Sequence, residues 1–368
     1  MVKISRNFLF VIVHVVFATV WISFRCGYRC ARCNWMSRRV NEDQGCCKSN
    51  SVQEGVKCEI AISDYVSSSW ERSWIQNISH WKSDDREWTT GCKQMRKDKE
   101  YLNFFQRFSS DPLRLGNHTR TVNGKEHERL RQVFSYHRAY DSCSKEEYFL
   151  YIEPLVSFLR HPGAVCFSNN PQDKSYIILP SALNIISKGA KKYFFDVGAS
   201  TYIAGLGGDS QKWFVDNYRL QGIEFDHIFG WEAKPTRPSK QWNSVPPDIK
   251  RKSSWYNIPA SSEKGHPDNP WTFVREIANK EDFIVVKIDI DTPKVEIELV
   301  MQLLEDPVLL SLVDEFYFEH HVHGNPMQFR GWGNLRRKNE NVPHPGIEHS
   351  YKIFQILREK GVRAHSWV

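Results

Sequence analysis

The sequence has none of the features typical of repeat proteins, wholly disordered proteins or polytopic membrane proteins. It carries no internal repeat and no long low-complexity tract, and its net charge of +7 is modest for 368 residues. Such a charge permits an anionic partner but does not mark a nucleic-acid-binding protein. The mean hydropathy of −0.53 excludes a polytopic membrane protein, although it is compatible with one membrane anchor. Hydrophobic residues make up 40% of the chain, which excludes a wholly disordered protein.

Cysteine is missing from the second half of the chain. None of the nine cysteines follows Cys166, and six of them lie before residue 60. A cysteine-dense stem before a cysteine-free region is typical of an oxidised, lumenal stalk. The spacing of Cys26, Cys30 and Cys33 also suits zinc or palmitate beside a membrane. No well-spaced fourth ligand accompanies these three, so we predict no metal site.

One long apolar run is present, and it lies near the N-terminus. Residues 8–24 form 17 residues, FLFVIVHVVFATVWISF, without a formally charged side chain. As a helix this run reaches roughly 25 Å, which is short for a bilayer but suits the thinner membranes of the early secretory pathway. A cleaved signal peptide is the alternative, but bulky Trp21 and Phe24 occupy the region of the expected cleavage site. We therefore interpret residues 1–24 as a signal-anchor.

The sequence gives conflicting signals for the topology of this anchor. Several arginines follow the apolar run, and the positive-inside rule would place that side in the cytosol. Sequons at Asn77 and Asn117 favour a lumenal body instead. We predict a single-pass glycoprotein of the Golgi or endoplasmic reticulum, with its main domain in the lumen.

Composition divides the chain into three parts. Residues 1–24 form the anchor, residues 25–140 a cysteine-rich stem and accessory region, and residues 141–368 an α/β domain. Ser144 and Glu147 form a capping-box pattern ahead of YFLYIEPLVSFLR, which predicts a helix there.

From about residue 185, strand-like apolar runs alternate with helical patterns. This alternation predicts β-α-β units and a doubly wound, Rossmann-like, mostly parallel sheet. The predicted strands are 193–197, 227–231, 255–258, 283–288, 315–319 and 362–368. The predicted helices are 210–221, 271–279, 294–305 and 348–360.

The first two of these strands end in acidic residues. The first runs into Asp196-Val197-Gly198-Ala199-Ser200. At the carboxyl end of a parallel strand, glycine permits a ligand to approach the backbone, and the carboxylate accepts from an ammonium or hydroxyl group. The second strand leads to Glu232, where an acidic residue accepts from both ribose hydroxyls in nucleoside-binding sheets. The alternative interpretations are an ordinary strand-to-helix turn and a solvated strand end.

The strand at 283–288 leads into a third acidic motif, VVKIDID. Lys287, Asp289 and Asp291 alternate with two isoleucines, as expected where a buried strand leaves a sheet. Asp289 would then point toward the same crevice. Three such motifs in sequence order are more specific than any one of them.

The segments FFDVGAS, WEA at Glu232, YNIPAS and VVKIDID resemble class I S-adenosylmethionine-dependent methyltransferases, most closely the FkbM type, over roughly residues 185–325. The resemblance implies a sheet of the seven-stranded type, with S-adenosyl-L-methionine across the carboxyl ends of its first strands. The cofactor-binding residues that it implies are Asp196, Gly198, Ala199, Ser200, Glu232, Ser261 and Asp289.

The chemistry of methyl transfer consists mainly of positioning and of removing a proton from the acceptor hydroxyl. The predicted catalytic residues are Asp289, Asp291 and His321, the last in EHHVHG, since histidine titrates near neutral pH. A surface edge with scattered histidines is the alternative for that segment. Location and family analogy indicate a glycan or another small hydroxylated acceptor.

Two other functions fit part of the sequence. Asp289-x-Asp291 also resembles the manganese site of Golgi glycosyltransferases, completed by a later histidine such as His320. That interpretation leaves FFDVGAS and Glu232 unexplained. A non-catalytic protein on the methyltransferase fold is the third, since the residues after Asp291 depart from the D-x-E-G-x-E pattern of the family.

Overall fold

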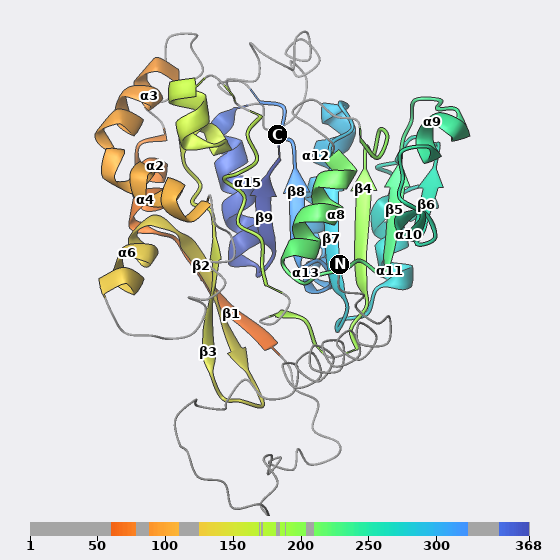
Figure 1. Cartoon of the computed structure of the whole chain (residues 1–368), viewed down its shortest axis with the longest axis horizontal. Helices are drawn as coiled ribbons and strands as arrows, with labels where there is room; N and C mark the ends of the chain where they lie inside the picture. The colour runs from red at the N-terminus through yellow and green to blue at the C-terminus, as the bar shows by residue number, and fades with distance from the viewer. Residues whose placement is uncertain are drawn as a thin grey trace, which may run out of the picture. The chain divides into compact units, whose positions relative to one another are not determined.

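A six-stranded parallel sheet forms the centre of the fold, with strand order β6-β5-β4-β7-β8-β9 (Figure 1). Its strands are β4 (Lys192–Val197), β5 (His227–Trp231), β6 (Ser253–Tyr256), β7 (Phe283–Ile288), β8 (Glu315–Phe318) and β9 (Arg363–Ser366). The computed structural model describes residues 60–78, 88–109, 125–168, 170, 172–181, 185–187, 189–203, 210–322 and 346–367.

The order of the strands reverses beside β4. The chain passes from β4 outward to β5 and β6, and then returns to β7 on the other side of β4 before it adds β8 and β9. The prediction of an α/β fold with a Rossmann-like, mostly parallel sheet is confirmed. Within the described residues this sheet has six strands, all parallel, where the resemblance implies a sheet of the seven-stranded type. Ligands of open α/β sheets bind outside the carboxyl ends of the strands at such a reversal.

Helices cover both faces of this sheet. Phe194 packs with α8 (Ser210–Leu220) on one face, and Phe195 packs with the helices of the other face. Because neighbouring strand residues point to opposite faces and both faces are covered, the central strands β4 and β7 consist mostly of apolar residues. The helices of the second face are α11 (Pro270–Ile277), α12 (Pro293–Glu305), α13 (Pro307–Leu312) and α15 (Ile347–Glu359). Two short helices precede β6, α9 (Pro238–Trp242) and α10 (Pro247–Lys250).

The residues before the sheet form an accessory region of helices and a second, antiparallel sheet of order β1-β2-β3. Its elements are β1 (Ile60–Val66), α2 (Ser69–Gln76), α3 (Trp88–Lys97), α4 (Lys99–Ser109), α6 (Lys125–Val133), β2 (Ser135–Asp141), β3 (Glu147–Ile152), η2 (Ser157–Leu159) and η3 (Ala164–Ser168). The domain boundary predicted between residues 140 and 141 therefore falls within one sheet, since β1 precedes it and β3 follows it. Cys58–Val368 form one compact unit.

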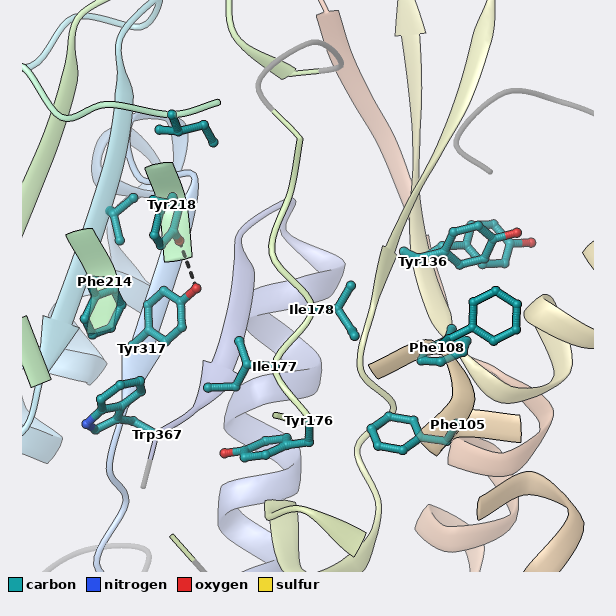
Figure 2. Close-up of a cluster of buried hydrophobic side chains, with 14 of the residues drawn as sticks. Phe105, Phe108, Tyr136, Tyr176, Ile177, Ile178, Phe214, Tyr218, Tyr317 and Trp367 are labelled. Atoms are coloured by element: carbon teal, nitrogen blue, oxygen red, sulfur yellow. Dashed lines mark hydrogen bonds between the residues drawn. The ribbon is translucent and has the colours of Figure 1, made fainter. Parts of the chain in front are cut away.

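One hydrophobic core joins the accessory region to the α8 face of the parallel sheet. Figure 2 shows Tyr176, Ile177 and Ile178 between aromatic side chains of both parts, such as Phe105 on one side and Trp367 on the other. Within the accessory region, Cys92 of α3 and Cys166 of η3 form a disulfide with a Cα–Cα distance of 5.2 Å.

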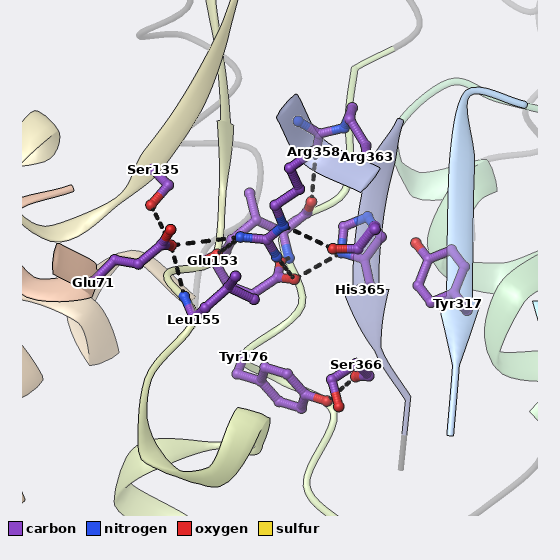
Figure 3. Close-up of polar contacts among 12 residues, drawn as sticks. Glu71, Ser135, Glu153, Leu155, Tyr176, Tyr317, Arg358, Arg363, His365 and Ser366 are labelled. Atoms are coloured by element: carbon purple, nitrogen blue, oxygen red, sulfur yellow. Dashed lines mark hydrogen bonds and ion pairs between the residues drawn. The ribbon is translucent and has the colours of Figure 1, made fainter. Parts of the chain in front are cut away.

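A buried network of charged side chains lies at the same junction (Figure 3). The Arg358 guanidinium donates to Glu153 Oε1 at 3.0 Å and forms an ion pair with Glu71 at 3.7 Å. His365 contacts Glu153 Oε1 through Nδ1 and Glu315 Oε2 through Nε2, each at 2.9 Å. Arg363 donates to Glu315 and to three backbone carbonyls. The network thereby binds α15 and β9 to the accessory region. We call it the core network.

The helix predicted after Ser144 is wrong. The residues Glu147–Ile152 form β3 and pair antiparallel with β2. The Asp141 carboxylate accepts from the backbone N–H groups of Cys143 at 2.8 Å and Ser144 at 3.3 Å, which closes a hairpin turn. Local bonds of this kind compete with a helix cap, and pairing with β2 adds a full ladder of backbone hydrogen bonds.

The strands predicted at 227–231 and 283–288 are confirmed with the same bounds. β6 begins two residues earlier than predicted and ends at Tyr256. The next residue, Asn257, uses its side-chain amide to bind the carbonyl groups of Glu232 and Lys234 instead.

Several predictions concern residues outside the described ranges. They include the anchor at 8–24, the stem cysteines up to Cys58, the sequon at Asn117 and the side chain of His323. Within the described ranges, no helix is both long and apolar enough to span a bilayer.

Candidate functional site

The candidate site lies at the carboxyl ends of β4, β5, β7 and β8. The residues predicted from the three acidic motifs lie at the ends of β4, β5 and β7 or directly after them. Because parallel strands all finish at the same edge of the sheet, these residues lie along one edge. The loop after β4 is bound to β5: the N–H groups of Gly198 and Ala199 donate to the Trp231 carbonyl at 3.0 and 2.8 Å. Glu232 is the next residue of the chain.

Gly198 is required by the close approach of two strand ends. Its φ is +96°, and an added Cβ would lie 1.7 Å from the carbonyl oxygen of Asp289. Asp289 in turn donates its backbone N–H to Val197 at 2.9 Å. The glycine therefore fixes the loop after β4 against the end of β7, in addition to any contact with a ligand.

Asp196 lies at the predicted strand end, but its carboxylate is fully buried. Lys287 Nζ lies 3.2 Å from Oδ1, and Gln211 of α8 donates to Oδ2 at 3.2 Å. Lys287 also contacts Asp289 Oδ2 at 3.1 Å and donates to the Gly198 carbonyl at 3.2 Å. Burial alone would lower the pKa of Lys287, but Asp196 and Asp289 outweigh it and raise that pKa. Asp196 thus acts on the site indirectly: it binds Lys287, which in turn contacts Asp289 and the Gly198 carbonyl.

Whereas Asp196 is buried, Glu232, the second predicted strand-end carboxylate, is partly exposed. Its Oε1 accepts from the backbone N–H of Lys234 at 2.6 Å, and its own N–H donates to Tyr256 of β6. Ser200 adopts a left-handed backbone with φ of 48°. Non-glycine residues rarely adopt such a conformation, and it is frequent at ligand sites. Ser261 lies in the loop after β6, where its Oγ accepts from the backbone N–H of Glu263.

A second group of side chains surrounds His321 beyond the end of β8. His321 Nδ1 lies 3.1 Å from Glu296 Oε2, and Nε2 lies 3.4 Å from both Asp291 Oδ1 and Glu319 Oε2. Burial would lower the pKa of His321, but these three carboxylates outweigh it and raise that pKa to about 12. We call Asp289, Asp291, Glu296, Glu319 and His321 the strand-end cluster.

The acidic members of the strand-end cluster influence one another. Burial raises the pKa of Asp289 to about 8, and Glu319 and Glu296 add to this effect against Lys287. Burial would also raise the pKa of Glu319, but His321, Arg160 and Asp289 outweigh it and hold that pKa well below its usual range. The pKa of Asp289 therefore lies near neutral pH, the range that suits a group which takes up and releases a proton.

The structure brings most of the predicted site residues together. Asp196, Gly198 and Asp289 are joined through Lys287, and Ala199 lies beside the strand end that carries Glu232. Ser200, Asp291, His321 and Ser261 occupy the loops after β4, β7, β8 and β6. His320, the histidine of the glycosyltransferase interpretation, instead places Nδ1 2.6 Å from Ser350 Oγ and stacks on Phe318.

Sequence reasoning missed several charged residues of this region. Lys287 stood out as a charge inside an apolar strand, which signals a buried partner. Glu319 and Glu296 were visible beside the motifs. Arg160, 3.6 Å from Glu319, and Lys174, whose pKa burial and Arg160 lower to about 8, come from the segment before the sheet and gave no signal.

Comparisons of the chain with protein-family models, with curated proteins and with solved structures find no match.

Proposed function

We propose that the protein transfers a methyl group from S-adenosyl-L-methionine to a hydroxyl group of a glycan or another small hydroxylated acceptor. The observation that carries the proposal is the Trp231 carbonyl, which accepts from both Gly198 and Ala199. These bonds hold the loop after β4 beside Glu232, at the reversal of strand order. A nucleoside-containing cofactor fits this position in open α/β sheets.

The residues at this edge suit such a cofactor in chemistry. Glu232 offers a partly exposed carboxylate, an acceptor-only group for the two ribose hydroxyls. Asp289, with its side chain 22% exposed, offers a second acceptor beside the loop of Gly198. Ser200 would lie at the amino-acid part of the cofactor and Ser261 near the adenine. Asp196 would act indirectly, since Lys287 and Gln211 bind its two oxygens.

The bound cofactor would supply a methyl group on a sulfonium, which is already a strong electrophile. The chain would hold the acceptor hydroxyl in line with that group and remove its proton. We assign the proton to the carboxylate of Asp289 or Asp291, which follow β7 at the same edge. His321, surrounded by three carboxylates, would position these groups.

We further propose that the protein is a single-pass membrane protein of the secretory pathway, anchored by residues 8–24, with no nucleic-acid partner. The Cys92–Cys166 disulfide supports an oxidising compartment. The Asn77 side chain, exposed at the end of α2, supports a lumenal glycoprotein.

Calorimetry with S-adenosylhomocysteine tests the cofactor site. Glu232→Ala should weaken binding by about tenfold or more, because a bond to two hydroxyls is lost. The matched control is Glu224→Ala, an exposed glutamate that precedes β5 and pairs only at the surface with Arg219 at 3.5 Å. Its affinity should equal that of the wild type. Absence of binding by the wild type, or equal affinities of wild type and Glu232→Ala, would contradict the proposal.

The two alternatives are separated by other ligands. Manganese-dependent binding of uridine or guanosine diphosphate, without binding of S-adenosylhomocysteine, would favour the glycosyltransferase. Binding of S-adenosylhomocysteine without turnover of any hydroxylated acceptor would favour the non-catalytic protein. A thermal-shift comparison of these ligands distinguishes the cases, because a ligand that binds only the native state raises its stability.

A further inference from the structure

Three atoms of the kind that bind metals converge at the ends of β7 and β8. Asp291 follows β7, and Glu319 and His321 follow β8. One ligand atom from each of these side chains lies within 4.8 Å of the other two. Two of the three side chains are buried, and Asp291 opens to solvent with 72% of its side chain exposed.

The distances around His321 Nε2 suit a shared cation. His321 Nε2 is 3.4 Å from each of the two carboxylate oxygens, whereas N–H···O bonds usually measure 2.7–3.2 Å. With ligand bonds of about 2.1 Å, two atoms 3.4 Å apart subtend an angle of about 108° at a common ion. This is close to the angle between neighbouring ligands of a tetrahedral site.

The orientation of the imidazole ring is fixed from behind. Glu296, of which 1% is exposed, places Oε2 3.1 Å from His321 Nδ1. Its other oxygen accepts from the Ile290 N–H at 2.8 Å. A carboxylate that holds one ring nitrogen leaves the other nitrogen aimed at the metal, an arrangement that most metal-bound histidines share.

Negative charge is in excess around these atoms. The carboxylates that contact one another or the same cations are Asp196, Asp289, Asp291, Glu296 and Glu319. The cationic groups that face them in the described ranges, apart from His321, are Lys287, Arg160 and Lys174. With His321 neutral, as a metal-binding histidine must be, and all five carboxylates ionised, five negative charges face three cations, and a divalent ion would balance them.

We propose that Asp291, Glu319 and His321 bind a divalent cation of the Mn²⁺ or Zn²⁺ type, with Glu296 as the partner of the imidazole. These ions accept a nitrogen ligand together with carboxylates, whereas Ca²⁺ takes oxygen ligands. The glycosyltransferase interpretation placed a metal on Asp289, Asp291 and His320, so the set proposed here shares only Asp291 with it. The exposed side of Asp291 leaves a position for an acceptor oxygen, a role that rests on the proposed methyl transfer.

Titration of the metal-free, full-length protein with Mn²⁺, followed by electron paramagnetic resonance, tests the site without cofactor. The wild type should bind one Mn²⁺ per chain, which Zn²⁺ displaces and Ca²⁺ does not. Asp291→Asn should weaken binding by at least about tenfold, or ~1.4 kcal/mol. Asparagine tolerates the φ of 53° at this exposed position, so folding is preserved. The matched control is Asp248→Asn, an exposed aspartate of α10 before the amino end of β6, which should bind like the wild type.

The positioning role of Glu296 has its own test. Glu296→Gln should weaken Mn²⁺ binding by about 10- to 100-fold, as the loss of partners behind metal-bound histidines does. The proposal is overturned if the wild type shows no saturable binding of Mn²⁺ or Zn²⁺ at millimolar concentrations, or if Asp291→Asn binds like the wild type. Because no cofactor is present, these results are independent of the calorimetry with S-adenosylhomocysteine.

Discussion

The core network and the strand-end cluster are both groups of buried charges, yet they differ in balance and in access to solvent. With His365 protonated, the core network has three cations and three carboxylates, and all six side chains are at most 5% exposed. Both nitrogens of His365 contact a carboxylate at 2.9 Å. In the strand-end cluster carboxylates are in excess, Asp291 is exposed, and one nitrogen of His321 lies 3.4 Å from two oxygens. Closed, balanced networks serve the fold, whereas open, unbalanced ones are candidates for binding.

The largest effect that we predict is the loss of stability in Arg358→Met. This change removes the Arg358 cation from buried Glu71 and Glu153 and leaves Glu153 with His365 alone; breaking a buried pair in this way typically costs about 3–5 kcal/mol. Chemical denaturation measures this difference. The control is Arg219→Met, whose ion pairs lie on the surface and should contribute less than about 1 kcal/mol. Equal stabilities of the two variants would show that the core network is not a structural joint.

The parallel sheet and the accessory region were only partly predictable from the sequence. The central strands of the parallel sheet were found because both of their faces are buried, so β4, β5 and β7 are mostly apolar. β3 was missed because its partner β2 lies in SYHRAYD, a segment whose polar residues gave no strand signal. Arg358 and Glu153, 205 residues apart, could not be paired from sequence at all.

The next largest effect concerns the backbone of the candidate site. Gly198→Ala combines a left-handed φ with a collision against the Asp289 carbonyl, and such strain costs at least about 1–3 kcal/mol. The loops after β4 and β7 should separate, so affinity for S-adenosylhomocysteine should fall while the core network stays intact. Gly265→Ala is a matched control, because that glycine also has a positive φ but no atom within 4 Å of an added Cβ. Equal affinity for the two variants would contradict the role of this contact.

A smaller effect on stability separates the two clusters most sharply. Asp291→Asn should change the free energy of unfolding by no more than about 0.5 kcal/mol in the presence of a chelator, because the residue is exposed. In Mn²⁺ at about 100 times its Kd, the wild type should gain about 2.7 kcal/mol and the variant much less. Thermal or chemical denaturation with and without the ion measures this gain. Equal gains would remove Asp291 from the metal site.

The candidate site was predicted better in position than in detail. Asp196, Glu232 and Asp289 occupy neighbouring strand ends because parallel strands finish together. Their partners were only partly predictable: Lys287 stood in the same motif as Asp289, whereas Gln211 meets Asp196 only through the packing of α8 on β4. The exposure of Asp291 likewise depends on the loop after β7, whereas Asp196 is buried within β4 between Lys287 and Gln211.

The smallest effect is a dependence of stability on pH within the core network. Burial opposes protonation of His365, but Glu153 and Glu315 outweigh it and raise the pKa of His365 above 6.5. Its contribution to stability is therefore complete below pH 6.5 and is lost as the pH rises through the raised pKa. The difference in stability between wild type and His365→Gln should be largest below pH 6.5 and should shrink at alkaline pH. A difference that grows with pH would contradict this assignment.

Hydrogen exchange of the full-length protein, with and without S-adenosylhomocysteine and Mn²⁺ together, tests the contrast between the two clusters most directly. Local protection reports which segments a ligand orders. We predict slower exchange in the segments that follow β4, β5, β7 and β8. We predict unchanged exchange in β3, whose carbonyl groups accept from Arg363, and in β9, which carries Arg363 and His365 of the core network. Unchanged exchange at all four strand ends, or protection confined to β3 and β9, would contradict the account.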